Sequence, residues 1–311
     1  MRRALSSIAA LAACLAACGG DSAPPSTSGA SVPPSTTGDS APPSTTGGAQ
    51  PPPEQAAPRT GAAIPREPRA LADRLAETQA ALASAIDRWR TDGDLAAYPP
   101  PREVTLWALH QQRIHLLLTS RPGLARDVLP LLPAKAAAHV RATIRARRGL
   151  GQITPPTPGR YRTGPPEPPR RLLAHYRKAQ RRFGVQWPVL AAVNFVESAF
   201  HRLRNSSAAG AQGPMQFIPS TWEAYGMGGD VNDPHDAIMG AANYLSASGA
   251  PRDLTGALYA YNPSDLYVRA VLAYAGRIRR DRNAFLSYYS WQVFVRLPEG
   301  GTRRITGPRP F

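Results

Sequence analysis

A near repeat of nine residues, rich in proline, serine and threonine, fills much of the first 64 residues of the chain. It begins at Ser22, Ser31 and Ser40, reads SAPPSTSGA, SVPPSTTGD and SAPPSTTGG, and leads into Pro51–Pro53. A segment with so few large apolar side chains has almost nothing to bury on folding. Residues 18–64 are therefore predicted to form a disordered, partly polyproline tether, and any hydrophobic core must come from residues 65–311.

The amino terminus has the pattern of an export signal. Arg2 and Arg3 precede an apolar run over residues 4–17 that is too short to span a bilayer. The run ends in Leu15-Ala16-Ala17-Cys18, which resembles the bacterial lipoprotein lipobox. That resemblance implies that residues 1–17 are a lipoprotein signal peptide and that Cys18 is acylated. The protein would then be exported and lipid-anchored to the membrane on its extracytoplasmic side. The alternative is an ordinary signal peptide whose cysteines are incidental.

The charge of the chain narrows the choice of partners. Lys and Arg number 37 against 21 Asp and Glu, which gives a formal net charge of +16. A field of this sign favours anionic partners such as nucleic acid, acidic lipid or an anionic cell-wall polymer. An exported protein seldom meets nucleic acid, so we expect no nucleic-acid partner.

From residue 65 onward, apolar residues recur at three- and four-residue spacings, as they do on one face of a helix. A helical accessory region is predicted over 65–150, followed by a proline-rich linker over 151–169 that separates two folding units. A second helical domain is predicted over 170–285, and a short C-terminal β-hairpin and tail over 286–311. His110, His115 and His139 lack ligand spacing and are interpreted as surface or satisfied core residues. The fold class is thus mainly α, with further helices predicted over 103–119, 125–132, 133–148, 170–183, 188–200, 220–225, 234–246, 253–261 and 264–280.

Glu197 is the only charged residue in the apolar stretch 187–200. A helix this apolar is largely buried, and a carboxylate in it is poorly solvated. Poor solvation raises the pKa of the carboxyl group and keeps its proton near neutral pH, as a general acid requires. The alternative is a glutamate at the rim of the helix that faces solvent.

Three sequence blocks then follow in the order found in one enzyme family. They are ESAF at 197–200, SAAGAQGPMQFIPSTW at 207–222, and Ala260-Tyr261-Asn262. Together they resemble the soluble lytic transglycosylases, members of the goose-lysozyme-like superfamily that cut peptidoglycan. The resemblance covers about residues 172–280 and is to actinobacterial-type lipoprotein members. It implies a lysozyme-like helical catalytic domain that acts on peptidoglycan glycan strands.

The resemblance also implies roles for individual residues. Glu197 would be the catalytic acid and base, and Tyr261 would hydrogen-bond to it and orient it. Gly210 and Gly213 would let the backbone approach the ligand, where a side chain would block it. Tyr267 is interpreted as a packing residue. The remaining positions implied to bind the substrate are Ser198, Ser207, Gly213, Met215, Gln216 and Asn262.

A single carboxylate at the site would favour a reaction without water. The resemblance implies cleavage of the MurNAc-β-1,4-GlcNAc bond with formation of 1,6-anhydroMurNAc ends. Hydrolytic glycosidases generally use two carboxyl groups, and other acids lie nearby in the chain, so a muramidase that hydrolyses the same bond remains an alternative. A non-catalytic wall-binding lipoprotein is another. The neighbouring acids are Asp230, Asp233, Asp236 and Asp265.

The segment 230–236 is crowded with oxygen ligands, as a calcium site would be, but it lacks the glycine and the distal glutamate of an EF-hand loop. Asp233 before Pro234 is also typical of a helix cap followed by proline at the first helical position. We favour the cap and expect neither a metal nor a cofactor.

Overall fold

The computed structural model describes residues 56–154, 160–298 and 300–308. Within these ranges the chain is mainly helical and ends in a small β-hairpin, which confirms the predicted fold class. The predicted signal peptide and Cys18 lie outside the described residues, as does most of the tether. No helix in the described ranges combines the length and the apolar character needed to cross a membrane.

The first four helices occupy the predicted accessory region, and each begins at or just after a proline. Proline suits a helix start because its fixed φ is helical and its missing N–H is not needed in the first turn. Glu67 caps α1 by accepting from the backbone N–H groups of Arg69 and Ala70. The elements are α1 (Pro68–Thr91), α2 (Arg102–Ser120), α3 (Pro122–Val128), a 3-10 turn η2 (Leu129–Leu131) and α4 (Ala134–Ile153).

Seven helices and two strands make up the rest of the described chain. The strands pair antiparallel with Phe294 opposite Arg304, as the predicted hairpin requires. Helix α11 (Ala284–Tyr289) was not predicted, and its last residues fall in the segment that was assigned to the hairpin and tail from residue 286. The elements are α5 (Pro169–Phe183), α6 (Trp187–Ser198), α7 (Pro219–Tyr225), α8 (Pro234–Ala247), α9 (Leu254–Tyr261), α10 (Asp265–Arg280), α11 (Ala284–Tyr289), β1 (Phe294–Arg296) and β2 (Thr302–Arg304).

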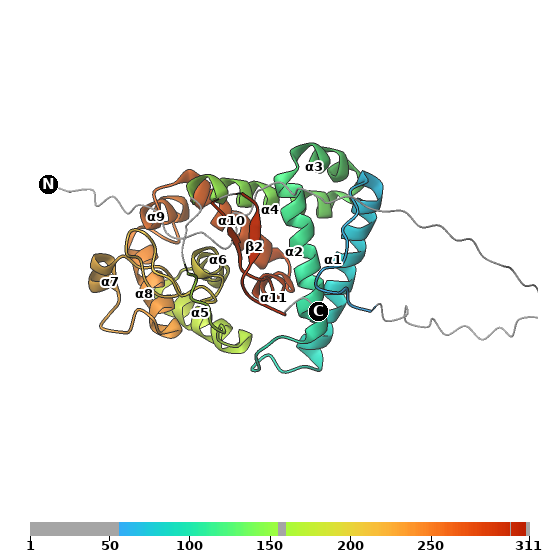
Figure 1. Ribbon diagram of the computed structural model, residues 1–311. Coiled ribbons are helices and arrows are strands. Elements are labelled where there is room, and N and C mark those ends of the chain that lie inside the picture. Colours follow the sequence, from blue (N-terminus) through green and yellow to red (C-terminus); the bar gives the residue numbers. More distant parts are fainter. Residues whose placement is uncertain (1–55, 155–159, 299, 309–311) are drawn as a thin grey trace, which may run out of the picture. The chain divides into compact units, whose positions relative to one another are not determined.

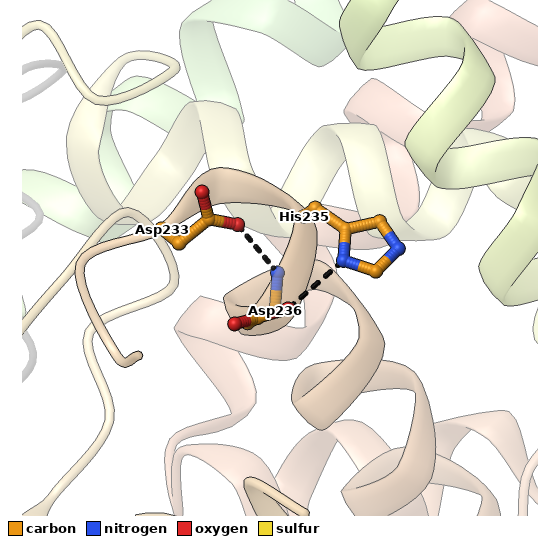
Figure 2. Close-up of side chains that lie close together, drawn as sticks. All are labelled: Asp233, His235 and Asp236. Atoms are coloured by element: carbon orange, nitrogen blue, oxygen red, sulfur yellow. Dashed lines mark hydrogen bonds and ion pairs between the residues drawn. The ribbon is translucent and has the colours of Figure 1, made fainter. Parts of the chain in front are cut away.

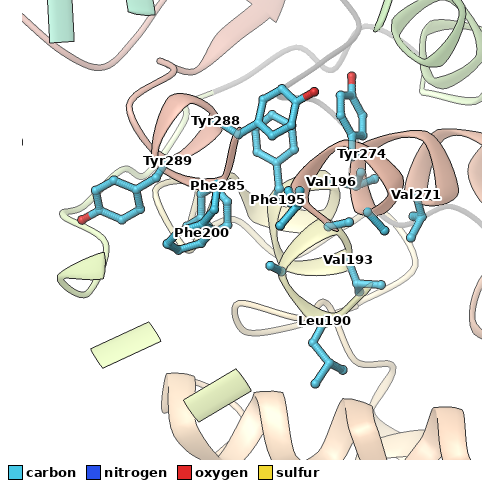
Figure 3. Packing of buried hydrophobic residues seen from close by; sticks show 14 of the residues in the cluster. Leu190, Val193, Phe195, Val196, Phe200, Val271, Tyr274, Phe285, Tyr288 and Tyr289 are labelled. Carbon is cyan, nitrogen blue, oxygen red and sulfur yellow. The ribbon is translucent and has the colours of Figure 1, made fainter. Parts of the chain in front are cut away.

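Almost every side chain of α6 is apolar, and other elements pack around the helix so that nearly all of these side chains are buried. Phe195 stacks on Phe200 at 5.4 Å and on Tyr288 at 5.0 Å between ring centroids. Figure 3 shows these rings together with aliphatic side chains from α6 and α10. The same cluster contains Leu190, Val193, Val196, Val271, Tyr274, Phe285 and Tyr289. The element that carries Glu197 is therefore held rigidly from several sides.

The accessory helices share this core. Leu82 and Trp89 of α1, Trp107 of α2 and Leu150 of α4 belong to the same hydrophobic cluster as α6, and α4 packs along α10 (Figure 1). The sequence predicts two folding units, whereas described residues of both predicted units contribute to this one core. Long-range packing of this kind leaves no trace in the local composition. Helices α1 to α4 also enclose a second cluster, which includes Leu71, Leu75, Ile114, Leu118, Val140 and Ile144.

The described ends of the predicted linker, residues 151–154 and 160–169, are more ordered than their composition suggests. Helix α4 continues to Ile153, and residues 160–168, although neither helix nor strand, pair with the chain after α6. Gly164 donates its N–H to the carbonyl of Arg202 at 3.1 Å, and Arg204 donates to the carbonyl of Arg162 at 2.9 Å. These bonds satisfy backbone groups that proline-rich sequence cannot pair within itself.

Two histidines of the accessory region do not match their interpretation. His110 and His115 are buried, and none of their ring nitrogens has a hydrogen-bond partner among the described residues. They are core residues, but their ring nitrogens lack the hydrogen bonds that the interpretation expected. Burial lowers the pKa of His115 to about 3, with the positive charges of Arg147 and Arg277 as a second cause.

Candidate active site

Glu197 lies in the last turn of α6, one residue before the helix ends, and is 1% exposed. Burial raises the pKa of its carboxyl group to about 8, although a hydrogen bond from Tyr267 acts in the opposite direction. At neutral pH the group therefore keeps its proton. Its Oε2 is also buried and has no hydrogen-bond partner in the described part of the chain, so one oxygen of the carboxyl group is left unpaired.

A tyrosine holds the other oxygen of Glu197, but it is not the one that the motif implied. The hydroxyl of Tyr267, on α10, donates to Oε1 at 2.7 Å. The hydroxyl of Tyr261 donates instead to the carbonyl oxygen of Met215 at 2.6 Å. Burial raises the pKa of the Tyr261 phenol, and the charge of Glu197 raises it further. Tyr261 is therefore still close to Glu197. The predicted hydrogen bond is therefore wrong, and the interpretation of Tyr267 as a packing residue is incomplete.

The chain reverses sharply after α6. Ala199, Phe200 and His201 have φ values of 51°, 60° and 66°, in the left-handed region that residues with a side chain rarely adopt. Three such residues in succession store strain, which persists only where the surroundings enforce it. Here the Phe200 ring is locked in the aromatic cluster, and the N–H of His201 donates to the Ser198 hydroxyl at 2.8 Å.

Ser198 ties this reversal to the second motif. Its hydroxyl donates to the carbonyl of Pro214 at 2.6 Å, and its side chain is fully buried. Asn194, one turn earlier on α6, donates its side-chain N–H to the sulfur of Met215 at 3.1 Å. The segment 213–216, called here the Gly-Pro-Met-Gln loop, thus makes two hydrogen bonds with α6. It makes a third with α9 through Tyr261. Ser198 and Met215, both implied to bind substrate, are buried inside this junction.

The other loop residues implied to bind substrate also have structural partners. The Ser207 hydroxyl accepts the backbone N–H groups of Ala209 and Ala211 and closes a turn. Gln216, at a φ of 52°, donates its side-chain N–H to the carbonyls of Asn205 and Gly213. Its Oε1 has no partner within the described ranges. Asn262 ends α9 and is 8% exposed, with its backbone N–H bonded to Leu258.

The two glycines of the loop differ in what surrounds them. Gly213 has a φ of 74°, and a Cβ there would overlap the carbonyl oxygen of Val231. Gly210 has a φ of 77°, but a Cβ there would meet nothing within 4 Å. The close approach expected at Gly213 is therefore to the protein's own backbone.

The acids at 230–236 form a helix cap and its supports. Asp233 accepts the N–H of Asp236 at 3.0 Å at the start of α8, as the favoured interpretation predicted. Asp236 accepts from His235 at 2.9 Å and from the N–H of Asp230 at 3.0 Å. Figure 2 shows Asp233, His235 and Asp236 side by side. Their ligand atoms lie within 4.8 Å of one another, but the cap accounts for the arrangement.

Comparison with known proteins shows what the segment around the site is similar to. Residues 175–283 match the model of the transglycosylase SLT domain. The match agrees with the family resemblance that the three motifs predicted. The chain is similar to the membrane-bound lytic murein transglycosylase F of Thiobacillus denitrificans, with 33% identity over 75 residues. That alignment covers 24% of this chain and spans only 16% of the relative. No solved structure matches the chain.

Proposed function

We propose that the protein is a peptidoglycan lytic transglycosylase. The substrate would be the MurNAc-β-1,4-GlcNAc bond of the glycan strand, and the product would carry a 1,6-anhydroMurNAc end. The observation that carries the proposal is Glu197, a buried carboxyl group with its pKa raised to about 8, in a chain segment that matches the model of the transglycosylase SLT domain. A protonated carboxyl at neutral pH is what cleavage of a glycosidic bond requires of its acid.

The reaction uses Glu197 twice. The carboxyl proton passes to the glycosidic oxygen, and the bond between that oxygen and the anomeric carbon breaks. The neighbouring N-acetyl group shields the positive anomeric carbon. The carboxylate then takes the proton from the C6 hydroxyl of the same sugar, whose oxygen forms the new bond to the anomeric carbon. Glu197 ends protonated, as it began, and no water is consumed.

The surroundings of Glu197 support a single-carboxylate mechanism. Two carboxyl groups at the spacing of a retaining glycosidase, about 5–5.5 Å, would shift each other's pKa strongly. The pKa of Glu197 is instead set by burial and by Tyr267. Of the acids that left hydrolysis open, Asp230, Asp233 and Asp236 accept hydrogen bonds from backbone N–H groups of their own segment.

Tyr267 would position the acid. By donating to Oε1 it leaves Oε2 as the oxygen that carries the mobile proton. Tyr261 would act one step further away, by holding the carbonyl of Met215 and with it the loop beside the acid.

Mass analysis of the muropeptides released from purified sacculi tests the proposal. We expect products that end in anhydro-muramic acid, each lighter by one water than the hydrolysis product. Products with reducing ends would identify a muramidase instead. If no muropeptides were released, the non-catalytic wall-binding protein would be the better interpretation. Glu197→Gln should lower turnover by about two to four orders of magnitude, because the amide has no proton to give. Retention of more than about a tenth of the rate would remove Glu197 as the acid.

The location of the enzyme is a separate proposal. Acylation of Cys18 would anchor it to the extracytoplasmic side of the membrane, and residues 18–64 would let the catalytic domain reach the wall. Clickable fatty-acid labelling should mark the wild type and not Cys18→Ala, which should leave the membrane and keep its catalytic activity. An unlabelled mature wild type would contradict the lipoprotein assignment.

A further inference from the structure

A pocket of about 440 Å³ lies beside the Gly-Pro-Met-Gln loop. It is bounded by the end of that loop, by α7 and by the segment that leads to α8. Phe217 connects it to the site: its ring lies 6.1 Å from that of Tyr261 on one side and 5.1 Å from that of Trp222 on the other. Its volume is in the range of small-ligand sites. The lining includes Gln212, Phe217, Trp222, Glu223, Gly229 and Val231.

Three polar side chains line this pocket. The exposed carboxylate of Glu223 makes no hydrogen bond or ion pair with the described residues. The indole of Trp222 and the side-chain amide of Gln212 also line the pocket. The indole itself is held in place, because α8 offers it the bare backbone of Gly240, where a Cβ would lie 2.8 Å from the ring. A fixed aromatic ring beside a free carboxylate is suited to a cationic group.

The charge around the pocket has the opposite sign to that of the chain. Residues 205–251 contain Glu223, Asp230, Asp233 and Asp236 but no lysine or arginine, in a protein of net charge +16. Asp236 lies next to the pocket, since a Cβ on Gly229 would come within 2.6 Å of its carboxylate. Hydrogen bonds from His235 and from the N–H of Asp230 hold the pKa of Asp236 below its usual value, so it stays anionic. The positive charge of Lys178 on α5 is directed to His235, at 3.0 Å. His235 does not line the pocket.

We propose that this pocket binds the primary ammonium group of the peptide stem on the glycan strand. This inference rests on the proposed function, because that function supplies the glycan strand whose stem the pocket would bind. A stem that carries a diamino acid has one aliphatic amine, which is protonated at neutral pH. The ammonium group would pair with Glu223, its methylene chain would lie on Trp222, and Gln212 would bond to the peptide backbone. The arrangement would make the enzyme prefer strands that still carry amine-bearing stems.

The test compares three forms of the same glycan strands: with amine-bearing stems, with the amines acetylated, and with the stems removed. For the full chain in detergent, kcat/KM should be highest on the first form. Glu223→Gln should lower the ratio of kcat/KM on amine-bearing strands to that on stem-free strands by about three- to tenfold, the effect of one partly solvated charged contact. Glu223→Lys should lower it further. The matched control is Asp127→Asn, which removes an exposed carboxylate from α3 and should leave the ratio unchanged.

On acetylated strands, wild type and Glu223→Gln should have the same kcat/KM, since the ammonium group that would pair with Glu223 is absent. Equal ratios for wild type, Glu223→Gln and Glu223→Lys would overturn the proposal, as would a preference that survives acetylation. Calorimetry with a free stem peptide, blocked at its amino terminus, separates this proposal from the proposed function. Glu223-dependent binding by a chain without lytic activity would support the pocket and refute the enzyme. Lytic activity without peptide binding, and with the same kcat/KM ratios in wild type and Glu223 variants, would support the enzyme and refute the pocket.

Discussion

The buried carboxyl group of Glu197 should cost the protein stability at the pH where it works. Its pKa is about 8 in the folded chain against 4.5 for an ordinary glutamate. A group with a raised folded pKa contributes its full stability below the unfolded value and loses it as the pH rises through the folded value. The free energy of unfolding should therefore fall between pH 4.5 and pH 8, by about 1.4 kcal/mol for each pH unit.

Glu197→Gln removes this dependence while it keeps the shape of the side chain and an oxygen to accept from Tyr267. From pH 4.5 to pH 7, two and a half units of loss amount to about 3 kcal/mol in the wild type. The variant should match the wild type near pH 4 and be more stable by about 3 kcal/mol at pH 7. For a folded region of this size that corresponds to a rise in Tm of roughly 6–12 °C.

Urea unfolding of both proteins at intervals from pH 4 to pH 8 measures the effect. The difference between the two free energies should grow steadily with pH, so that the inactive variant is the more stable protein. Glu223→Gln is the matched control, because Glu223 is exposed and its replacement should leave the two curves parallel. Parallel curves for Glu197→Gln would refute the reasoning, since Glu197 would then ionise as easily in the folded chain as in the unfolded one.

Further predictions concern the hydrogen bond, the loop and the core. Tyr267→Phe removes the bond that lowers the pKa of Glu197, so the alkaline limb of kcat/KM should move to higher pH; a limb that stays in place would exclude Tyr267 as a positioning residue. Gly213→Ala should destabilise the chain by more than about 2 kcal/mol, because strain adds to a backbone overlap. Gly210→Ala, at a similar φ but in open space, should cost only about 1 kcal/mol in denaturant unfolding, and equal costs would contradict the overlap. Burial holds the pKa of His115 at about 3 against 6.5, so stability should fall as the pH drops below 6.5, by about 1.4 kcal/mol per unit. Unfolding of His115→Leu should show a shallower acid slope, and an unchanged slope would rule out His115 as the cause.

Local sequence patterns were enough to predict most of the fold. The helices over 103–119, 170–183, 234–246 and 264–280 occur within a few residues of their predicted ends, because apolar periodicity, prolines and caps act over one or two turns. For Glu197 the sequence left two alternatives, a buried acid in an apolar helix and a glutamate at the rim that faces solvent, and the structure shows the buried one.

The partners of those residues depended on the tertiary structure. Tyr261 and Tyr267 are six residues apart on either side of the break between α9 and α10, and no local rule says which hydroxyl reaches Glu197, some 70 positions earlier. The common core of the accessory helices and α6, and the contact of Gly213 with Val231, likewise join segments that are distant in the chain. The sequence by itself determined where most helices form and that a single acid lies in a strongly apolar one, because both follow from short-range periodicity. Only the packed structure decided which groups meet, because such contacts depend on the relative placement of whole elements.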